Sequence, residues 1–240
     1  WKVRVWDKDG IESSYSKTAR FSTAILQENE WQAKWIGKAF APDPADQRGY
    51  YATPVAVHAN GDSTRVDERS LLLRKDLNIP KRIKKAIAHV TGLGYYEFLI
   101  NGAKVGNFVL SPAKTFYPKS ILYDTFDVTE LLQEEKNTLG ITLGNGWFNP
   151  LKKRWNWRMQ WFGDKRAFLQ MHIEFADGTS EVIISDESWK YAPGPILTSC
   201  VYDGEVYDAR EESPGWDKPD FDDSVWKNAD VLKSPGGNLE

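Results

Sequence analysis

The stretch that decides the fold is Gly92–Trp147, which begins GLGYYEFLINGAKVG and ends LGITLGNGW. Side chains alternate between two faces along residues 95–100, and this period of two is typical of a β-strand with one buried face. Asn101-Gly102 follows at once, and this dipeptide supplies the two positive φ angles of a type I′ turn. The stretch therefore predicts a β-hairpin, with a returning strand that starts near Lys104.

A second hairpin is predicted further along the chain by the same logic. Residues 172–176 alternate before Asp177-Gly178, and Glu181–Ile184 return. Strand-like runs between the hairpins are 120–128 and 138–143, a further strand is expected at 71–77, and only 129–135 looks helical, over one or two turns. Short β-runs roughly ten residues apart, without a sustained period of 3.6, predict an all-β fold, a jelly-roll β-sandwich of the galactose-binding-domain-like type.

Several sequence motifs occur along the chain in a distinctive order. They are TGLGYYEFLINGAKVG, LYDTFDVTELL, LGNGWF, YDGEVYDAR and PDFDDSVW. This order resembles the N-terminal, non-catalytic β-sandwich of bacterial α-L-rhamnosidases, the large enzymes of glycoside hydrolase family 78. The resemblance covers the chain from about Trp31 to the C-terminus. It implies an accessory domain that scaffolds a downstream catalytic barrel, a rhamnose-containing glycan as a further ligand, and a bacterial protein that is periplasmic or exported.

The first residues carry a separate pattern. Side chains alternate along Trp1–Trp6, Asp7–Gly10 turns the chain, and Ala19–Ser22 extends again. This pattern resembles the last two strands of a fibronectin type III-like domain, and two strands cannot complete such a sandwich. We therefore expect a partial fibronectin-like hairpin at 1–28, whose upstream strands are missing from the chain, and the jelly-roll sandwich at 29–240.

Length limits the chemistry of the chain. Its 240 residues can bury a good core, but they cannot also hold a helical catalytic barrel. In the resembled family the catalytic acid and base belong to that barrel, so we expect no catalytic residue here and an inactive chain. Two alternatives remain. One is a purely structural interdomain module without a ligand, and the less favoured one is an independent glycosidase that uses Glu205 and Asp208 as its carboxylate pair.

Charge and composition argue against several classes of partner. The net charge is −3 with Lys and Arg scattered, so neither nucleic acid nor a membrane is expected to bind. The single cysteine, Cys200, allows no intrachain disulfide and is expected to be a small buried strand residue. The three histidines show no metal-ligand spacing. Residues 41–68 have the composition of a loop.

Aromatic residues gather just after the decisive stretch. Five of the eleven tryptophans lie between Trp147 and Trp189, and residues 145–162 have no period, which indicates a long loop. Indole faces suit the C–H side of a sugar ring, and amide and guanidinium groups can bond its hydroxyls. The alternative is that the loop packs on its own sandwich or on the catalytic domain. The candidate carbohydrate-binding residues are Trp147, Asn149, Arg154, Trp155, Asn156, Trp157, Arg158 and Trp161.

The motif YDGEVYDAR supplies three candidates for an interdomain junction, Glu205, Asp208 and Arg210. An internal Asp208–Arg210 pair, or bonding to the backbone, would explain these charges without a ligand.

Metal binding has two candidate segments. The resemblance raises a calcium-bridged rhamnose site, but Ser111–Tyr117 lacks the acidic or amide groups for it and contains Lys114. The Asp-rich stretch 217–223 does not match a calcium loop; we expect turn and cap hydrogen bonds there, with Phe221 and Trp226 packed on the sheet. The prediction is therefore no metal and no cofactor, with calcium as the alternative.

Overall fold

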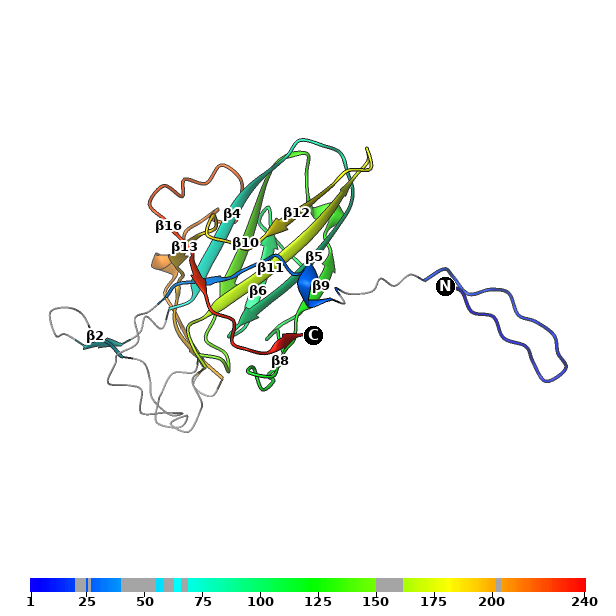
Figure 1. Cartoon of the computed structure of the whole chain (residues 1–240), viewed down its shortest axis with the longest axis horizontal. Coiled ribbons are helices and arrows are strands. Elements are labelled where there is room, and N and C mark those ends of the chain that lie inside the picture. The colour runs from blue at the N-terminus through cyan, green and yellow to red at the C-terminus, as the bar shows by residue number, and fades with distance from the viewer. Residues whose placement is uncertain are drawn as a thin grey trace. The chain divides into compact units, whose positions relative to one another are not determined.

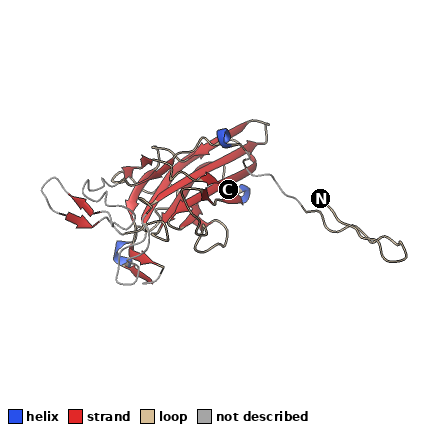
Figure 2. Ribbon diagram, turned by 60° about the horizontal axis from the view of Figure 1, so that its bottom comes forward, coloured by secondary structure: helices blue, strands red, loops and turns tan. Residues whose placement is uncertain are grey.

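The computed structural model describes residues 1–19, 25, 27–39, 55–57, 63–65, 69–149, 162–201 and 204–240. It divides into two compact units, Trp1–Trp31 and Gln32–Glu240. The helical segments described are short 3-10 turns at Glu28–Glu30, Thr129–Leu131 and Ala209–Glu211. Strands make up the rest of the regular structure (Figures 1 and 2).

Two antiparallel sheets build the second unit. The first sheet has the order β17-β1-β11-β5-β9, with β12 paired to β11, and the second has the order β16-β13-β4-β10-β6-β7. The first contains β1 (Trp35–Gly37), β5 (Ile83–Leu93), β9 (Asp124–Asp127), β11 (Arg166–Phe175), β12 (Ser180–Ile184) and β17 (Asp230–Leu232). The second contains β4 (Leu71–Ile79), β6 (Tyr96–Ile100), β7 (Ala103–Lys104), β10 (Glu135–Leu143), β13 (Lys190–Pro193) and β16 (Lys227–Asn228).

Three smaller strand pairs accompany the sheets. They are β2 (Val55–Val57) with β3 (Ser63–Arg65), β14 (Ile196–Cys200) with β15 (Gly204–Tyr207), and the parallel pair β8 (Ser120–Ile121) with β18 (Asn238–Leu239). The β2–β3 hairpin lies within the segment that was predicted to be a loop. Cys200 is buried in β14, as predicted.

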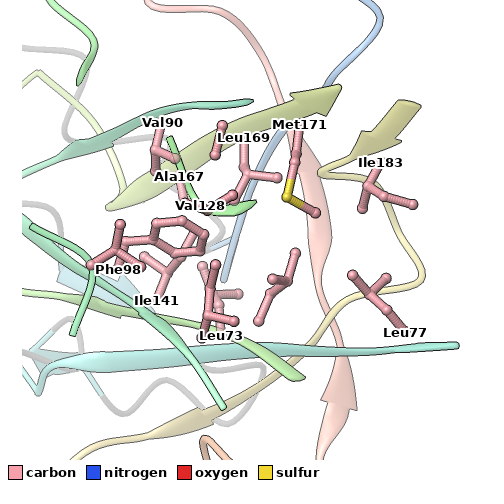
Figure 3. Close-up of a cluster of buried hydrophobic side chains, with 14 of the residues drawn as sticks. Leu73, Leu77, Val90, Phe98, Val128, Ile141, Ala167, Leu169, Met171 and Ile183 are labelled. Atoms are coloured by element: carbon pink, nitrogen blue, oxygen red, sulfur yellow. The ribbon is translucent and has the colours of Figure 1, made fainter. Parts of the chain in front are cut away.

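The core lies between the two sheets (Figure 3). Val90, Leu169 and Met171 point inward from the first sheet toward Leu73 and Phe98 of the second. Each of these side chains is at most 1% exposed. Alternate residues of each strand supply this layer, as the period of two requires. The predicted all-β jelly-roll sandwich is confirmed.

The outer face of the second sheet is also covered. A Cβ added at Gly140 of β10 would lie 3.0 Å from the Trp216 ring, so the loop after β15 packs directly on the strand. Trp226 stacks on Trp216 at 6.1 Å and meets the edge of Phe221 at 5.7 Å between centroids. The Asp222 carboxylate accepts the Ser224 N–H at 3.0 Å. The predicted turn role of this segment is confirmed, while Phe221 and Trp226 are half-buried and Trp216 makes the contact with the strand.

The two predicted hairpins differ in their turns. Asn101 and Gly102 have φ of +52° and +83°, which confirms the type I′ turn between β6 and β7. In the β11–β12 hairpin only Gly178 has a positive φ, +85°, and its N–H donates to the Phe175 carbonyl at 3.0 Å. The prediction of a type I′ turn is therefore wrong for this second hairpin. Its geometry is a type I turn followed by a left-handed glycine.

Two predicted strands have different limits in the structure. The single run 120–128 is split into β8 and β9, which pair with β18 and β5. In the first unit the chain returns earlier than predicted, because Glu12 already bridges Trp6 and the Ser16 N–H donates to the Val3 carbonyl at 2.8 Å. The fibronectin-like assignment of this hairpin stays a prediction.

Candidate functional site

A cavity of about 630 Å³ lies where β6 begins and β10 ends, beside the β14–β15 hairpin. This volume is in the range of small-molecule sites. Its polar lining residues include Tyr95, Ser199 and Glu205, and its apolar lining includes Val109 and Leu110. The cavity therefore combines a few polar groups with an apolar wall.

Two glycine-rich turns cross at this cavity. A Cβ on Gly94 would lie 1.7 Å from the Asn145 carbonyl oxygen, and one on Gly146 would lie 2.7 Å from the Gly94 carbonyl carbon. Gly146 also has a φ of +49°. Only glycine allows such a close approach of two backbones. The motifs TGLGYY and LGNGWF thus encode a crossing of two turns that shapes the cavity.

A buried polar network fixes the cavity wall. Asn145 donates from Nδ2 to the Ser199 carbonyl at 3.1 Å, and its Oδ1 accepts from Lys165 Nζ at 3.0 Å. Lys165 also donates to the Arg69 carbonyl. A buried ammonium is tolerated only with such partners. Sequence reasoning missed Asn145 and Lys165, since a lysine in a polar turn before a strand is usually solvated.

Trp147 lies beside the cavity, half-buried and held by protein groups. Lys114 Nζ lies 4.2 Å from the centroid of its ring, a favourable cation–π geometry. Tyr95 hydrogen-bonds with Trp147; burial raises the Tyr95 pKa, and this bond opposes the rise. Burial and the neighbouring Tyr95 raise the pKa of Tyr117 to about 12. Lys114 thus occupies one indole face on which a sugar would stack.

Asn149 is turned into the protein. Its Nδ2 donates to the Gly163 carbonyl at 2.9 Å, and the side chain is buried. Neighbouring Phe148 is fully buried and stacks on Phe162 with centroids 5.9 Å apart. These contacts favour the packing alternative for this end of the loop. The other candidates, Arg154, Trp155, Asn156, Trp157, Arg158 and Trp161, lie outside the described residues, and their role stays a prediction.

The three candidate junction residues lie on or just after β15. Glu205 is exposed and lines the cavity. Asp208 caps the turn that follows, accepting from the Arg210 N–H at 3.0 Å, and it pairs with Arg210 Nη2 at 2.6 Å. Hydrogen bonding to the Arg210 side chain lowers the pKa of Asp208. The internal Asp208–Arg210 pair is therefore confirmed, while a junction role stays a prediction.

An apolar rim borders the cavity and the adjoining hairpin. Val109 is 75% exposed and Leu110 is 70% exposed. Leu110 also has a φ of +55°, which strains a residue other than glycine. With exposed Val201, Val206 and Tyr207 of the β14–β15 hairpin they form a surface that we call the apolar rim.

A second cavity of about 430 Å³ adjoins the first. Both are lined by Glu97, Thr142 and Ile196, so together they form one trough along β6 and β10. The far wall of the trough carries Trp216 and Asp217. Aromatic and carboxylate side chains therefore occur along its length.

Within the described ranges, no group of three or more His, Cys, Asp or Glu side chains could hold a metal ion. In the Asp-rich stretch, Asp223 pairs with Lys190 at 2.6 Å and with Arg74. In the part of the chain that is described, no helix is long and apolar enough to cross a membrane.

Comparison with known proteins points to one family. The family model described as Alpha-L-rhamnosidase N-terminal domain matches residues 81–240. An alpha-L-rhamnosidase of Formosa agariphila is 35% identical to the chain over 94% of its length. The chain covers 24% of that relative.

Solved structures agree with this match. The alpha-L-rhamnosidase of Dictyoglumus thermophilum superposes with a TM-score of 0.79 at 38% identity, covering 100% of this chain and 25% of that one. The Streptomyces avermitilis alpha-L-rhamnosidase complexed with L-rhamnose gives 0.67 at 33% identity, over 75% of this chain and 18% of that one. The chain thus spans about a quarter of the length of its relatives. It belongs to the alpha-L-rhamnosidase N-terminal domain family.

Proposed function

We propose that this chain is a non-catalytic accessory domain of an α-L-rhamnosidase, and that its apolar rim holds the catalytic domain. The observation that carries the proposal is the exposure of Val109 and Leu110 beside the cavity. Exposed apolar side chains gathered around a hollow mark a surface that another part of a protein covers. Since the chain spans about a quarter of its relatives, those proteins have room for a separate catalytic domain.

Substitution of the two most exposed rim residues tests this function. In the enzyme that carries this chain, Val109→Ser combined with Leu110→Ser should separate one cooperative thermal transition into two, because the two domains lose their shared apolar contact. Scanning calorimetry measures the separation. The chain by itself should keep its own transition, since both side chains are already exposed in it.

A matched control is Val225→Ser, which removes an apolar side chain that is 86% exposed and does not belong to the rim. This variant should unfold like the wild type. A double rim variant that also unfolds in one wild-type transition would exclude docking through the rim.

One of the two candidate carboxylates is unsuited to the acid role of a glycosidase. An inverting glycosidase needs one carboxyl group that is protonated at working pH and one that is ionised. Arg210 lowers the pKa of Asp208, which keeps this carboxylate ionised and unsuited to the acid role. We expect the chain alone to release no p-nitrophenol from p-nitrophenyl α-L-rhamnoside. Turnover above the uncatalysed rate would support the independent-glycosidase alternative.

The trough favours a second function, binding of rhamnose-containing glycans. It offers Tyr95 and Trp216 as aromatic groups and Glu205 and Asp217 as acceptors for hydroxyl groups. The similar Streptomyces avermitilis enzyme was solved with L-rhamnose. A catalytic domain docked on the rim would cover part of the trough, so the two functions compete for one surface.

Calorimetric titration separates the two functions. Rhamnosylated oligosaccharides, with and without calcium, should give heat that Glu205→Gln reduces several-fold, since this carboxylate lines the cavity. Glu181→Gln, an exposed exchange on β12, is the matched control and should bind like the wild type. No heat at about 10 mM sugar, far above the affinity that a useful site needs, would leave docking as the function.

A further inference from the structure

A row of polar side chains crosses the outer face of the first sheet and ends on Gln32 and Ala33, the first residues of the second unit. Gln170 on β11 is fully buried in this row. Its Oε1 accepts from the backbone N–H of Gln32 at 2.7 Å and of Ala33 at 3.2 Å. Its Nε2 lies 3.0 Å from Nε2 of His172.

These contacts determine which ring nitrogen of His172 carries the proton. Because two backbone N–H groups face one end of the Gln170 amide, that end must be the oxygen, and the NH₂ group faces His172. An NH₂ group only donates, so Nε2 of His172 must accept. The ring is therefore neutral, with its proton on Nδ1.

We propose that Gln170 and His172 form a pH-sensitive latch that holds the Gln32–Ala33 segment on the sandwich. When His172 takes up a proton, its Nε2 becomes a donor, and only a reversed Gln170 amide can accept from it. The reversed amide turns its NH₂ group toward the two backbone N–H groups, which then lose their acceptor. The two hydrogen bonds of the segment break together.

The loosened region should end at Lys34, which has anchors of its own. The Lys34 N–H donates to the Ser185 carbonyl at 2.8 Å, and Ser185 Oγ donates to the Lys34 carbonyl at 2.6 Å. The Lys34 ammonium pairs with Glu187 at 2.8 Å. None of these bonds involves Gln170 or His172, so protonation of the latch leaves them in place.

The strand register defines the charged surroundings of His172. By register, the nearest ionisable residues on its face of the sheet are Glu174 of β11, Lys85 and His89 of β5 and Asp127 of β9, and β12 places Val182 opposite it. Glu174 is paired with Lys84. The His89 and His172 rings lie 5.9 Å apart. Burial, and then the charge of His172, lower the pKa of His89 to about 4.

Hydrogen exchange of the Gln32 and Ala33 amides tests the latch. In the whole chain, the protection of these two amides, corrected for the intrinsic exchange rate, should fall about tenfold or more between roughly pH 7 and pH 5. A fall of this size is what the loss of two hydrogen bonds would produce. The Lys34 amide should keep its protection. Unchanged protection of Gln32 and Ala33, at a pH where NMR shows both ring nitrogens of His172 protonated, would overturn the proposal.

Two variants isolate the titrating group. His172→Gln cannot take up the proton and still offers an acceptor to Gln170, so the protection of Gln32 and Ala33 should become independent of pH. His89→Gln is the matched control and should keep the pH dependence. The latch is overturned if His172→Gln keeps that dependence or if His89→Gln abolishes it.

A third variant should reverse the direction of the pH dependence. Gln170→Glu presents carboxylate oxygens both to the backbone and to His172, and a protonated His172 bonds a carboxylate more strongly. Acidification should then raise the protection of Gln32 and Ala33. A fall like that of the wild type would contradict the proposed role of the amide. If this buried exchange does not fold, the result with His172→Gln decides.

Discussion

Gly94 has no room for a side chain, and this gives a direct test of the crossing that shapes the cavity. A Cβ there would lie 1.7 Å from the Asn145 carbonyl oxygen, so Gly94→Ala must displace the backbone of a neighbouring turn. We expect the free energy of unfolding in urea to fall by about 2–4 kcal/mol.

Gly144, which lies in the other turn next to Asn145, is the matched control for Gly94. Its nearest neighbour would lie 3.5 Å from an added Cβ, an ordinary contact. Gly144→Ala should therefore change the free energy of unfolding by less than about 1 kcal/mol. Equal losses in the two variants would mean that the backbone crossing does not limit the residue type.

His89 makes the stability of the sandwich depend on pH. Its pKa is about 4 in the folded chain, against a usual 6.5, so the unfolded chain binds this proton more readily. The contribution of His89 to folding is complete above pH 6.5 and is lost as the pH falls toward 4. The loss reaches roughly 3 kcal/mol. Urea unfolding along this pH range should show it, and a His89→Gln variant with the same pH slope would contradict it.

At the scale of elements, one buried cation attaches the loop after β15 to the second sheet. Arg74 is fully buried on β4, donates to the Trp216 carbonyl at 2.9 Å and pairs with Asp223 and with Asp76 at 2.6 Å. Arg74→Leu leaves Asp76 without this cation, removes one of the two cations of Asp223, which keeps Lys190, and leaves the Trp216 carbonyl without its donor. We expect a loss of about 3–5 kcal/mol in the free energy of unfolding.

The control for Arg74 is Arg210, which also forms an ion pair but has a side chain that is 89% exposed. Arg210→Leu should leave the urea midpoint unchanged, because water and salt screen such a pair. If Arg74→Leu were as stable as Arg210→Leu, the aromatic contacts and the Lys190–Asp223 pair would be enough to hold the loop.

The hairpins show which elements can be predicted from the sequence. Asn101-Gly102 specifies its own turn locally, so β6 and β7 were predicted correctly. Asp177-Gly178 has the same local signal, yet only its glycine has a positive φ. The 120–128 run splits because β8 pairs with β18, more than a hundred residues further along the chain. The pairing of strands that lie far apart in the sequence leaves no periodic pattern within either strand, so it could not be predicted.

At the scale of the whole molecule, the candidate site likewise depends on contacts between distant segments that the sequence does not reveal. The predicted site was one continuous loop that starts at Trp147, whereas the cavity beside it joins four separate segments around Gly94, Leu110, Asn145 and Glu205. Of these only Glu205 was a candidate. The glycine motifs were recognisable as a family signature, but the crossing that they permit depends on two turns fifty residues apart.

The two compact units lead to a prediction for the whole molecule. Residues Gln32–Glu240 contain both sheets and the buried core that lies between them. A unit with its own core folds on its own. A chain that starts at Gln32 should therefore unfold in one cooperative step, with a free energy within about 1 kcal/mol of that of the full chain. Circular dichroism during urea unfolding measures this value, and a large loss would mean that Trp1–Trp31 contributes to the stability of the sandwich.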